Sequence, residues 1–459
     1  MSTKTTSAAE RDIQTILTGH PYRAILRLAW PATLAMLLHT LFSITDAIWV
    51  GRLGAVPIAA VISATFIVWI LLSLTSVLST GVVAMVARHI GAGDRDTARE
   101  VAEESFRFAL IYAFAITVTG LLLRRYLFAL MDLAPDVARL GESYMQVYFS
   151  ASVLVVFVEW AGSVFRASGN TRLPLVVTST AVVLNIGLDP LLIFGWGPVP
   201  RLGATGAAVA TMIAYLAASV IFVVLLRGSK LPFPLHLRLI GPIDWSRIRR
   251  LVTIGLPISI SGISFSVIYL FVNRITAQFG TPAVAALGIG NRIESINYLV
   301  AYGCATAVAT LVGQNLGARN PDRAAELTNK TVLLVSAFTG AMTVVFLTFP
   351  ESIMRIFVDD PAVLEAGKDY VRILALSQIL MGWEIVLEGA FSGSGDTIPP
   401  MAVSIVGSVL RIPLAWFLAV SLGWGVAGVW WAISISTLIK GTAVYIWFSL
   451  GHWKHRTVH

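Results

Sequence analysis

The chain alternates long apolar runs with short polar segments from about residue 26 to residue 449. Each run holds roughly 20 or more mostly apolar residues, which is the length that an α-helix needs to cross a bilayer. The runs are continuous and do not alternate residue by residue, as the strands of a membrane barrel would. The pattern predicts an all-α membrane protein with twelve transmembrane helices, at residues 26–50, 56–86, 101–123, 139–167, 172–195, 204–226, 251–278, 283–314, 327–349, 363–391, 398–421 and 425–449.

Composition agrees with this fold class and excludes a soluble globular domain. Hydrophobic residues make up 56% of the chain and charged residues 13%, and the mean hydropathy is +0.80. The net charge of +8 could indicate a nucleic-acid partner, but the basic residues lie mainly in short loops between spans, where they act as topology signals. We therefore expect no nucleic-acid binding and a multi-pass protein of the cell (inner) membrane.

The placement of the basic residues also predicts the topology. They gather before the first span and after the second, fourth and sixth, which puts them on one side if the amino terminus is cytoplasmic. Both termini are then cytoplasmic, because the number of spans is even. Residues 1–20 contain no apolar core with a cleavage site, so we expect no removable signal peptide.

An internal repeat organises the chain. A single offset of 226 residues places Pro31 on Pro257 and carries the FRASGNTRLP segment at 165–174 onto FSGSGDTIPP at 391–400 without a gap. Each half holds six predicted spans, so both enter the membrane from the same face and form parallel repeats.

The repeat predicts three parts and a mode of action. The parts are an amino-terminal six-helix bundle at 1–227, a cytoplasmic linker at 228–247 and a carboxy-terminal six-helix bundle at 248–459. Two similar bundles can rock against one another and open a V-shaped central cavity to each side in turn. The sequence has no GxxxxGK[ST] motif for ATP, so an ion gradient would supply the energy. We expect a secondary transporter without a cofactor.

Three polar residues stand out inside apolar spans of the amino-terminal half. Asp46 lies in the first span, while Asn185 and Asp189 lie four residues apart, on one face of the fifth. The repeat places Val272 and Ala415 at the positions of the two acids, so ion coupling should belong to the first half. Such carboxylates are costly in a bilayer and are usually functional. They could bind a proton, bind sodium through oxygen ligands, or act only as hydrogen-bonded contacts between helices.

These features together resemble the multidrug and toxic compound extrusion (MATE) transporters, and within them the DinF-type branch. The resemblance rests on Pro31 fifteen residues before Asp46, on the N-x-x-x-D of Asn185 and Asp189, and on the two repeated turns at 165–174 and 391–400. It implies twelve helices in two bundles and export of lipophilic, often cationic compounds by antiport against protons or sodium.

The resemblance also implies a set of ion-coupling residues. Asp46, Asn185 and Asp189 would bind the coupling ion, and they would be its metal ligands if the ion is sodium. A threonine of the sixth span would join them, which is Thr211 here, with Thr205 left open as an alternative.

Four further residues are candidates for the transport mechanism. His39 lies seven residues before Asp46, two turns away on the same face, and could relay protons or line the cavity wall. Tyr144 could line the cavity, and Glu159 could either attract cations there or pair with a nearby basic group. Pro31 lacks an amide donor, so it gives the first span a place to bend.

Arg411 is predicted near the middle of the eleventh span, where an unpaired guanidinium would be costly. Glu384 and Glu388, four residues apart in the tenth span, are its expected partners. We expect a structural ion pair there, with substrate binding as the alternative.

Two other functions were weighed against multidrug export. A flippase of lipid-linked oligosaccharides or lipids from the same superfamily remains the alternative transporter, although it would call for several cavity arginines and commonly two extra helices. A lipid-modifying membrane enzyme would need clustered His, Asp or Glu at a membrane interface, whereas the seven histidines are scattered. We expect no catalytic residues, a lipid bilayer and small substrates as the partners, and a monomer.

Overall fold

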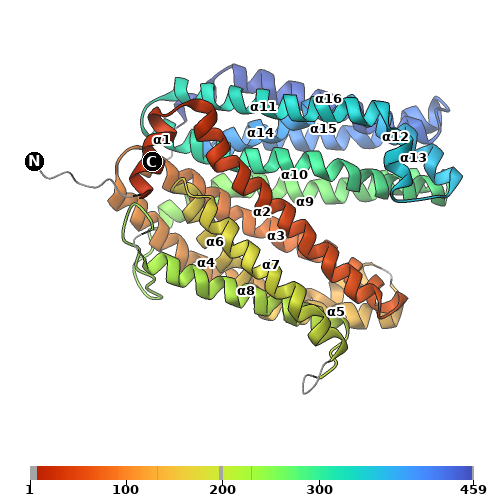
Figure 1. Cartoon of the computed structure of the whole chain (residues 1–459), viewed down its shortest axis with the longest axis horizontal. Helices are drawn as coiled ribbons and strands as arrows, with labels where there is room; N and C mark the ends of the chain where they lie inside the picture. The colour runs from red at the N-terminus through yellow and green to blue at the C-terminus, as the bar shows by residue number, and fades with distance from the viewer. Residues whose placement is uncertain (1–7, 132, 196–199, 229, 457–459) are drawn as a thin grey trace, which may run out of the picture.

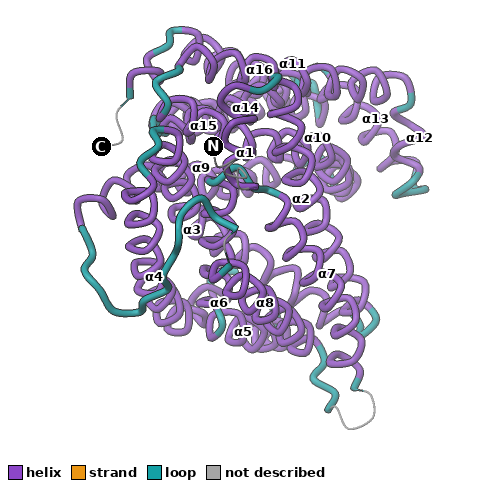
Figure 2. The backbone as a smooth tube through the Cα atoms, turned by 60° about the vertical axis from the view of Figure 1, so that its left-hand side comes forward, coloured by secondary structure: helices purple, strands orange, loops and turns teal. Residues whose placement is uncertain are grey.

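The computed structural model describes residues 8–131, 133–195, 200–228 and 230–456, and these form helices without a β-strand (Figure 2). The helices are α1 (Ala8–Thr18), α2 (Pro21–Gly51), α3 (Ala55–Gly91), α4 (Arg95–Ala129), α5 (Pro135–Ser150), α6 (Ser152–Ala167), α7 (Arg172–Phe194), α8 (Ala204–Arg227), α9 (Trp245–Ala277), α10 (Thr281–Gly317), α11 (Pro321–Thr348), α12 (Pro350–Arg355), α13 (Pro361–Ala375), α14 (Gln378–Ser394), α15 (Ile398–Trp416) with a π-helical turn (Phe417–Ser421), α16 (Val426–Ser449) and a 3₁₀ turn (His452–His455).

The predicted all-helical membrane fold is confirmed, and two of its spans are broken. Within the described residues, ten helices are long and apolar enough to cross a membrane singly. Two bent pairs, α5 with α6 at 51° and α13 with α14 at 57°, bring the number of spans to twelve when each pair counts as one. The pairs match the predicted spans at 139–167 and 363–391. Their breaks, at Ala151 and Ser377, lie 226 residues apart.

The repeat is visible in individual contacts. The Thr171 hydroxyl at the start of α7 donates to the Leu28 carbonyl at 2.9 Å, and the Thr397 hydroxyl at the start of α15 donates to the Ile254 carbonyl at 2.7 Å. Both members of each pair are related by the same 226-residue offset. The two halves therefore tie their repeated proline-containing turns to their first long helices in the same way.

The helices form two groups that meet at the end carrying α1 and diverge from there (Figure 1). One group contains α2–α8 and the other α9–α16. At the meeting end, Gly91 of α3 packs against the Gln314 carbonyl and Gly317 of α10 against the Arg88 carbonyl, and a Cβ atom would collide at either position. Small residues let membrane helices approach closely, so these reciprocal, repeat-related contacts hold the two groups together.

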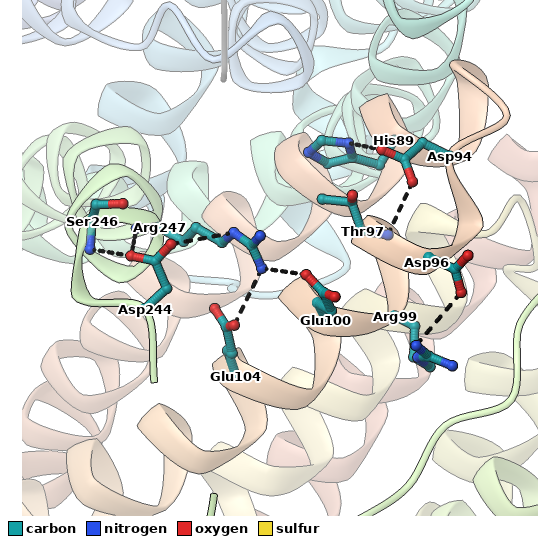
Figure 3. Close-up of polar contacts among 10 residues, drawn as sticks. All are labelled: His89, Asp94, Asp96, Thr97, Arg99, Glu100, Glu104, Asp244, Ser246 and Arg247. Carbon is teal, nitrogen blue, oxygen red and sulfur yellow. Dashed lines mark hydrogen bonds and ion pairs between the residues drawn. The ribbon is translucent and has the colours of Figure 1, made fainter. Parts of the chain in front are cut away.

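Polar contacts reinforce the junction (Figure 3). Asp244 accepts hydrogen bonds from the Ser246 and Arg247 amides and caps α9. The Arg247 guanidinium then reaches α4 of the other group, donating to Glu100 at 2.8 Å and to Glu104 at 3.2 Å. Because α9 begins at Trp245, the last residues of the predicted linker are already helical. The domain boundaries at 227 and 248 remain a prediction.

Candidate functional site

The site is built on α7, whose polar and apolar side chains occupy different faces. Asn185 and Asp189 are completely buried, whereas Val183 and Ile186 beside them are exposed on the outside of the helix. The Asn185 amide donates to Asp189 Oδ1 at 3.1 Å, which the four-residue spacing predicts. The apolar face can lie against lipid while the polar face points into the protein.

Two further helices complete a cluster around this face. Thr211 of α8 is completely buried and lies 3.5 Å from the Asn185 amide nitrogen. Asp46 of α2 is 7% exposed, and its carboxyl group interacts with Asp189, Asn185 and Thr211. We call this set the N-half cluster; it consists of Asp46, Asn185, Asp189 and Thr211. The structure thus brings together the four residues predicted for ion coupling, and it favours Thr211 over Thr205.

The N-half cluster has more acceptors than donors. Asp46 Oδ1, Asn185 Oδ1 and Asp189 Oδ2 are each buried without a hydrogen-bond partner, and buried acceptors of this kind are costly. The interactions of the two carboxyl groups include no basic side chain. A proton, or a hard cation that prefers oxygen ligands, fits this chemistry.

A sodium site here would need more than carboxylates. Among the described residues, no group of three or more His, Cys, Asp or Glu side chains is placed to hold a metal ion. The amide oxygen of Asn185 and the hydroxyl of Thr211 would have to supplement the two carboxyl groups. These neutral oxygens are present in the cluster, so the sequence prediction of Asp46, Asn185 and Asp189 as sodium ligands stays open.

The other candidate residues of the first half have different surroundings. Tyr144 is buried and interacts with both carboxyl groups of the N-half cluster. His39 stacks on Phe42 with 6.3 Å between ring centroids and interacts with Glu159. Glu159 Oε2 lies 3.7 Å from the Arg166 guanidinium, so it has the basic neighbour that sequence analysis offered as one alternative.

Two prolines lie in the helices that carry the acids. Pro31 is buried within α2, about 22 Å along the helix from Asp46 at 1.5 Å per residue. Pro190 directly follows Asp189 within α7 and removes one backbone hydrogen bond there. Sequence analysis missed Pro190, although the D-P pair inside an apolar run was a visible signal.

The expected pairing of Arg411 with Glu384 and Glu388 is wrong. The buried Arg411 guanidinium donates to Ser436 at 2.9 Å and to Thr437 at 3.4 Å, both on α16. Its charge lies 5.6 Å from the centre of the Tyr269 ring. The side chains that satisfy the guanidinium are therefore hydroxyls and an aromatic ring.

Glu384 has a different partner. It forms a 2.8 Å ion pair with Lys440 of α16, and the two side chains are only 12% and 7% exposed. Glu388 interacts with both of them. Lys440 was missed although a lysine within the last apolar run is a signal in itself.

Sequence analysis also missed a buried polar network on α10. Glu294 accepts hydrogen bonds from the Tyr370 hydroxyl at 2.7 Å and from the Gln378 amide at 2.6 Å. Asn297 donates to Gln378 at 2.8 Å. The network follows a single acid in the predicted eighth span, so the carboxyl group of Glu294 was its available signal.

Comparison with known proteins gives consistent results. The MatE family model matches residues 31–191 and again 257–417, two segments separated by the same 226 residues. The chain is 27% identical over 438 residues to the probable multidrug resistance protein NorM of Thermotoga maritima, covering 95% of this chain and 94% of that protein. It is also 27% identical over 444 residues to the FAD transporter of Shewanella oneidensis, covering 95% and 96%.

Solved structures have the same fold. A crystal structure of MATE in the straight conformation superposes with a TM-score of 0.89 at 25% identity, over 96% of this chain and 98% of that one. A MOP superfamily transporter from Pyrococcus furiosus, described as having a binding pocket of reverse polarity, gives a TM-score of 0.89 at 24% identity over 98% of each chain. The second likeness shows the fold alone.

Proposed function

The chain belongs to the MatE family of multi-pass membrane transporters, and on that premise we propose that it is a secondary active multidrug exporter. It would expel lipophilic or cationic compounds in exchange for protons or sodium, with the N-half cluster binding the coupling ion. Relatives named as multidrug resistance proteins favour this function over the flippase alternative.

The observation that carries the proposal is the chemistry of the N-half cluster. Two buried carboxyl groups interact with each other, and three oxygen atoms in the cluster have no donor. Two negative charges in a confined apolar setting repel each other strongly, so binding of a proton or a cation relieves a large unfavourable energy. A group of this kind can respond to an ion gradient, whereas a neutral contact between helices cannot.

A change of charge in the cluster would alter how α2 and α7 pack. Pro190 lies beside Asp189, and the missing backbone hydrogen bond lowers the cost of bending α7 there. Pro31 gives α2 a similar weak point near the junction of the two groups. We propose that the two groups of helices rock about this junction, and that it lies on the cytoplasmic side of the inner membrane with both termini.

Growth of a drug-sensitive bacterial host tests the proposal. Asp46→Asn and Asp189→Asn should each abolish resistance, because an amide cannot release a proton and binds a cation more weakly. Pro31→Ala should weaken resistance. Asp96→Asn makes the same chemical change at a carboxyl group in an exposed ion pair and serves as the matched control. Equal resistance from both cluster variants, at equal expression by blotting, would return the acids to a packing role.

A further inference from the structure

The second half contains a positional copy of the N-half cluster with different chemistry. The 226-residue offset carries Asn185 onto Arg411 and Thr211 onto Thr437. The contact between the two positions is kept, since the Asn185 amide lies 3.5 Å from the Thr211 hydroxyl and the Arg411 guanidinium 3.4 Å from the Thr437 hydroxyl. The two sites are therefore built on the same pair of helices in each repeat.

A third position confirms the correspondence. Tyr144 of α5 interacts with both acids of the N-half cluster, and its counterpart Tyr370 of α13 interacts with Arg411. Both tyrosines are almost completely buried.

The acids of the first half have no counterpart at these positions. Val272 and Ala415 replace Asp46 and Asp189, and both are completely buried within an apolar core. Where the first half has two carboxyl groups without a cation, the second half has a guanidinium. The charge of that guanidinium is permanent, because arginine does not lose its proton in proteins.

A counter-charge for the guanidinium comes from a different helix. Glu294 of α10 interacts with Arg411 and is held by hydrogen bonds from Tyr370 and Gln378. Tyr269 of α9 lies under the guanidinium and donates to Asn291 at 3.2 Å. The positive charge is thus enclosed by groups from α9, α10, α13, α15 and α16.

We propose that Arg411 is a tethered substitute for the coupling cation, which keeps the second half permanently in the arrangement that the first half adopts only with its ion bound. The proposal rests on the proposed function, because it takes the N-half cluster to be the ion site. It assigns one coupling-ion site to each chain. It also makes the second half the rigid partner against which the first half moves.

The proposal requires the second half to be insensitive to pH and sodium. The titratable and charged groups that face Arg411 are Tyr269, Glu294 and Tyr370, while α16 contributes the hydroxyls of Ser436 and Thr437. Glu294 is the only carboxyl group in this set, and the guanidinium supplies its counter-charge. Removal of the guanidinium would leave Glu294 in need of a proton or a cation.

Hydrogen exchange followed by mass spectrometry, on the full-length purified protein, separates the two halves. Exchange is measured at two pH values with correction for the intrinsic rates, and with sodium against potassium at one pH. Peptides from α2 and α7 should change in protection, whereas peptides from their repeat counterparts α9 and α15 should not. Unresponsive α2 and α7 would refute the proposed function itself; responsive α9 and α15 in the unmodified protein would overturn only the tethered-cation proposal.

Substitutions at Arg411 test the cause. Arg411→Gln should make the exchange of α9 and α15 depend on pH or sodium, because Glu294 loses its permanent counter-charge. Arg411→Lys keeps the positive charge and should remain unresponsive, which makes it the matched control. The proposal is overturned if Arg411→Gln is as unresponsive as the unmodified protein, or if Arg411→Lys responds. The measurement on the unmodified protein decides the matter even where Arg411→Gln fails to fold.

Discussion

Replacement of Lys440 by Met removes one partner of the buried ion pair between α14 and α16. Met keeps most of the length and apolar volume of the lysine stem, so the change is mainly one of charge. Glu384 lies 2.8 Å from the lysine nitrogen and is 12% exposed. Glu388 interacts with both members of the pair, so the substitution leaves two neighbouring carboxyl groups without their cation.

The magnitude follows from the distance and the burial. Two unit charges 2.8 Å apart attract each other by about 6 kcal/mol at an effective dielectric constant of about 20. Desolvation of the two ions offsets most of this attraction in the intact pair. Removal of one partner leaves the other buried and uncompensated, which typically costs about 3–5 kcal/mol. We therefore expect Lys440→Met to destabilise the protein by that amount.

Thermal unfolding of the detergent-solubilised protein, followed by size-exclusion chromatography, measures the effect. Lys440→Met should lower the apparent Tm by roughly 5 °C or more, given that about 1 kcal/mol shifts Tm by a few degrees in smaller proteins. The double variant Lys440→Met with Glu384→Gln should recover most of the loss, because no uncompensated charge remains at the pair. Equal destabilisation by the single and double variants would refute the ion pair as the source of the effect.

Two further predictions concern the junction of the two groups of helices. Gly317→Val should prevent the close approach of α3 and α10 and lower both yield and transport, whereas Gly288→Ala, on the same helix with open space around it, should be neutral or stabilising by up to about 1 kcal/mol; chromatographic yield and drug efflux report both. Hydrogen bonds from Ser246 hold the pKa of Asp244 below its usual value of 3.8. The capping contribution to stability is therefore complete above 3.8 and is lost as the pH falls through the lowered pKa, so hydrogen exchange in the first turn of α9 should accelerate at that acid pH, and Asp244→Asn should show no such transition.

The sequence was sufficient for most of the fold because the repeat constrains it twice. Apolar run length predicts spans, and the 226-residue offset requires each half to repeat the other. Contacts that were not predicted, such as those of Thr171 and Thr397, follow the same offset. The bends inside two spans could not be predicted, because no proline or glycine interrupts the chain at Ala151 or Ser377.

The candidate site was predictable to different degrees. The four-residue spacing places Asn185 and Asp189 on one face of a helix without any knowledge of the tertiary structure. Asp46 and Thr211 lie on other helices, and only the family resemblance indicated that they would join the first two. A sequence gives the faces of a helix but does not give its rotation relative to its neighbours.

Arg411 illustrates that limit. The residue and the two glutamates of α14 were recognised as buried charges, but α16 contributes the partners of both. Ser436 and Lys440 lie four residues apart on one face of α16, so the first meets Arg411 and the second meets Glu384. The pairing depends on this third helix, whose lysine the hydrophobic pattern concealed.

The most direct test of ion-coupled export uses purified protein in proteoliposomes. A proton gradient and a sodium gradient are imposed separately, and movement of a fluorescent cationic dye is followed for the unmodified protein and for Asp189→Asn. We expect at least one gradient to drive the dye against its own concentration gradient in the unmodified protein, and neither to do so in the variant. Gradient-driven movement that is the same in both proteins, or absent from both, would contradict coupling through the N-half cluster.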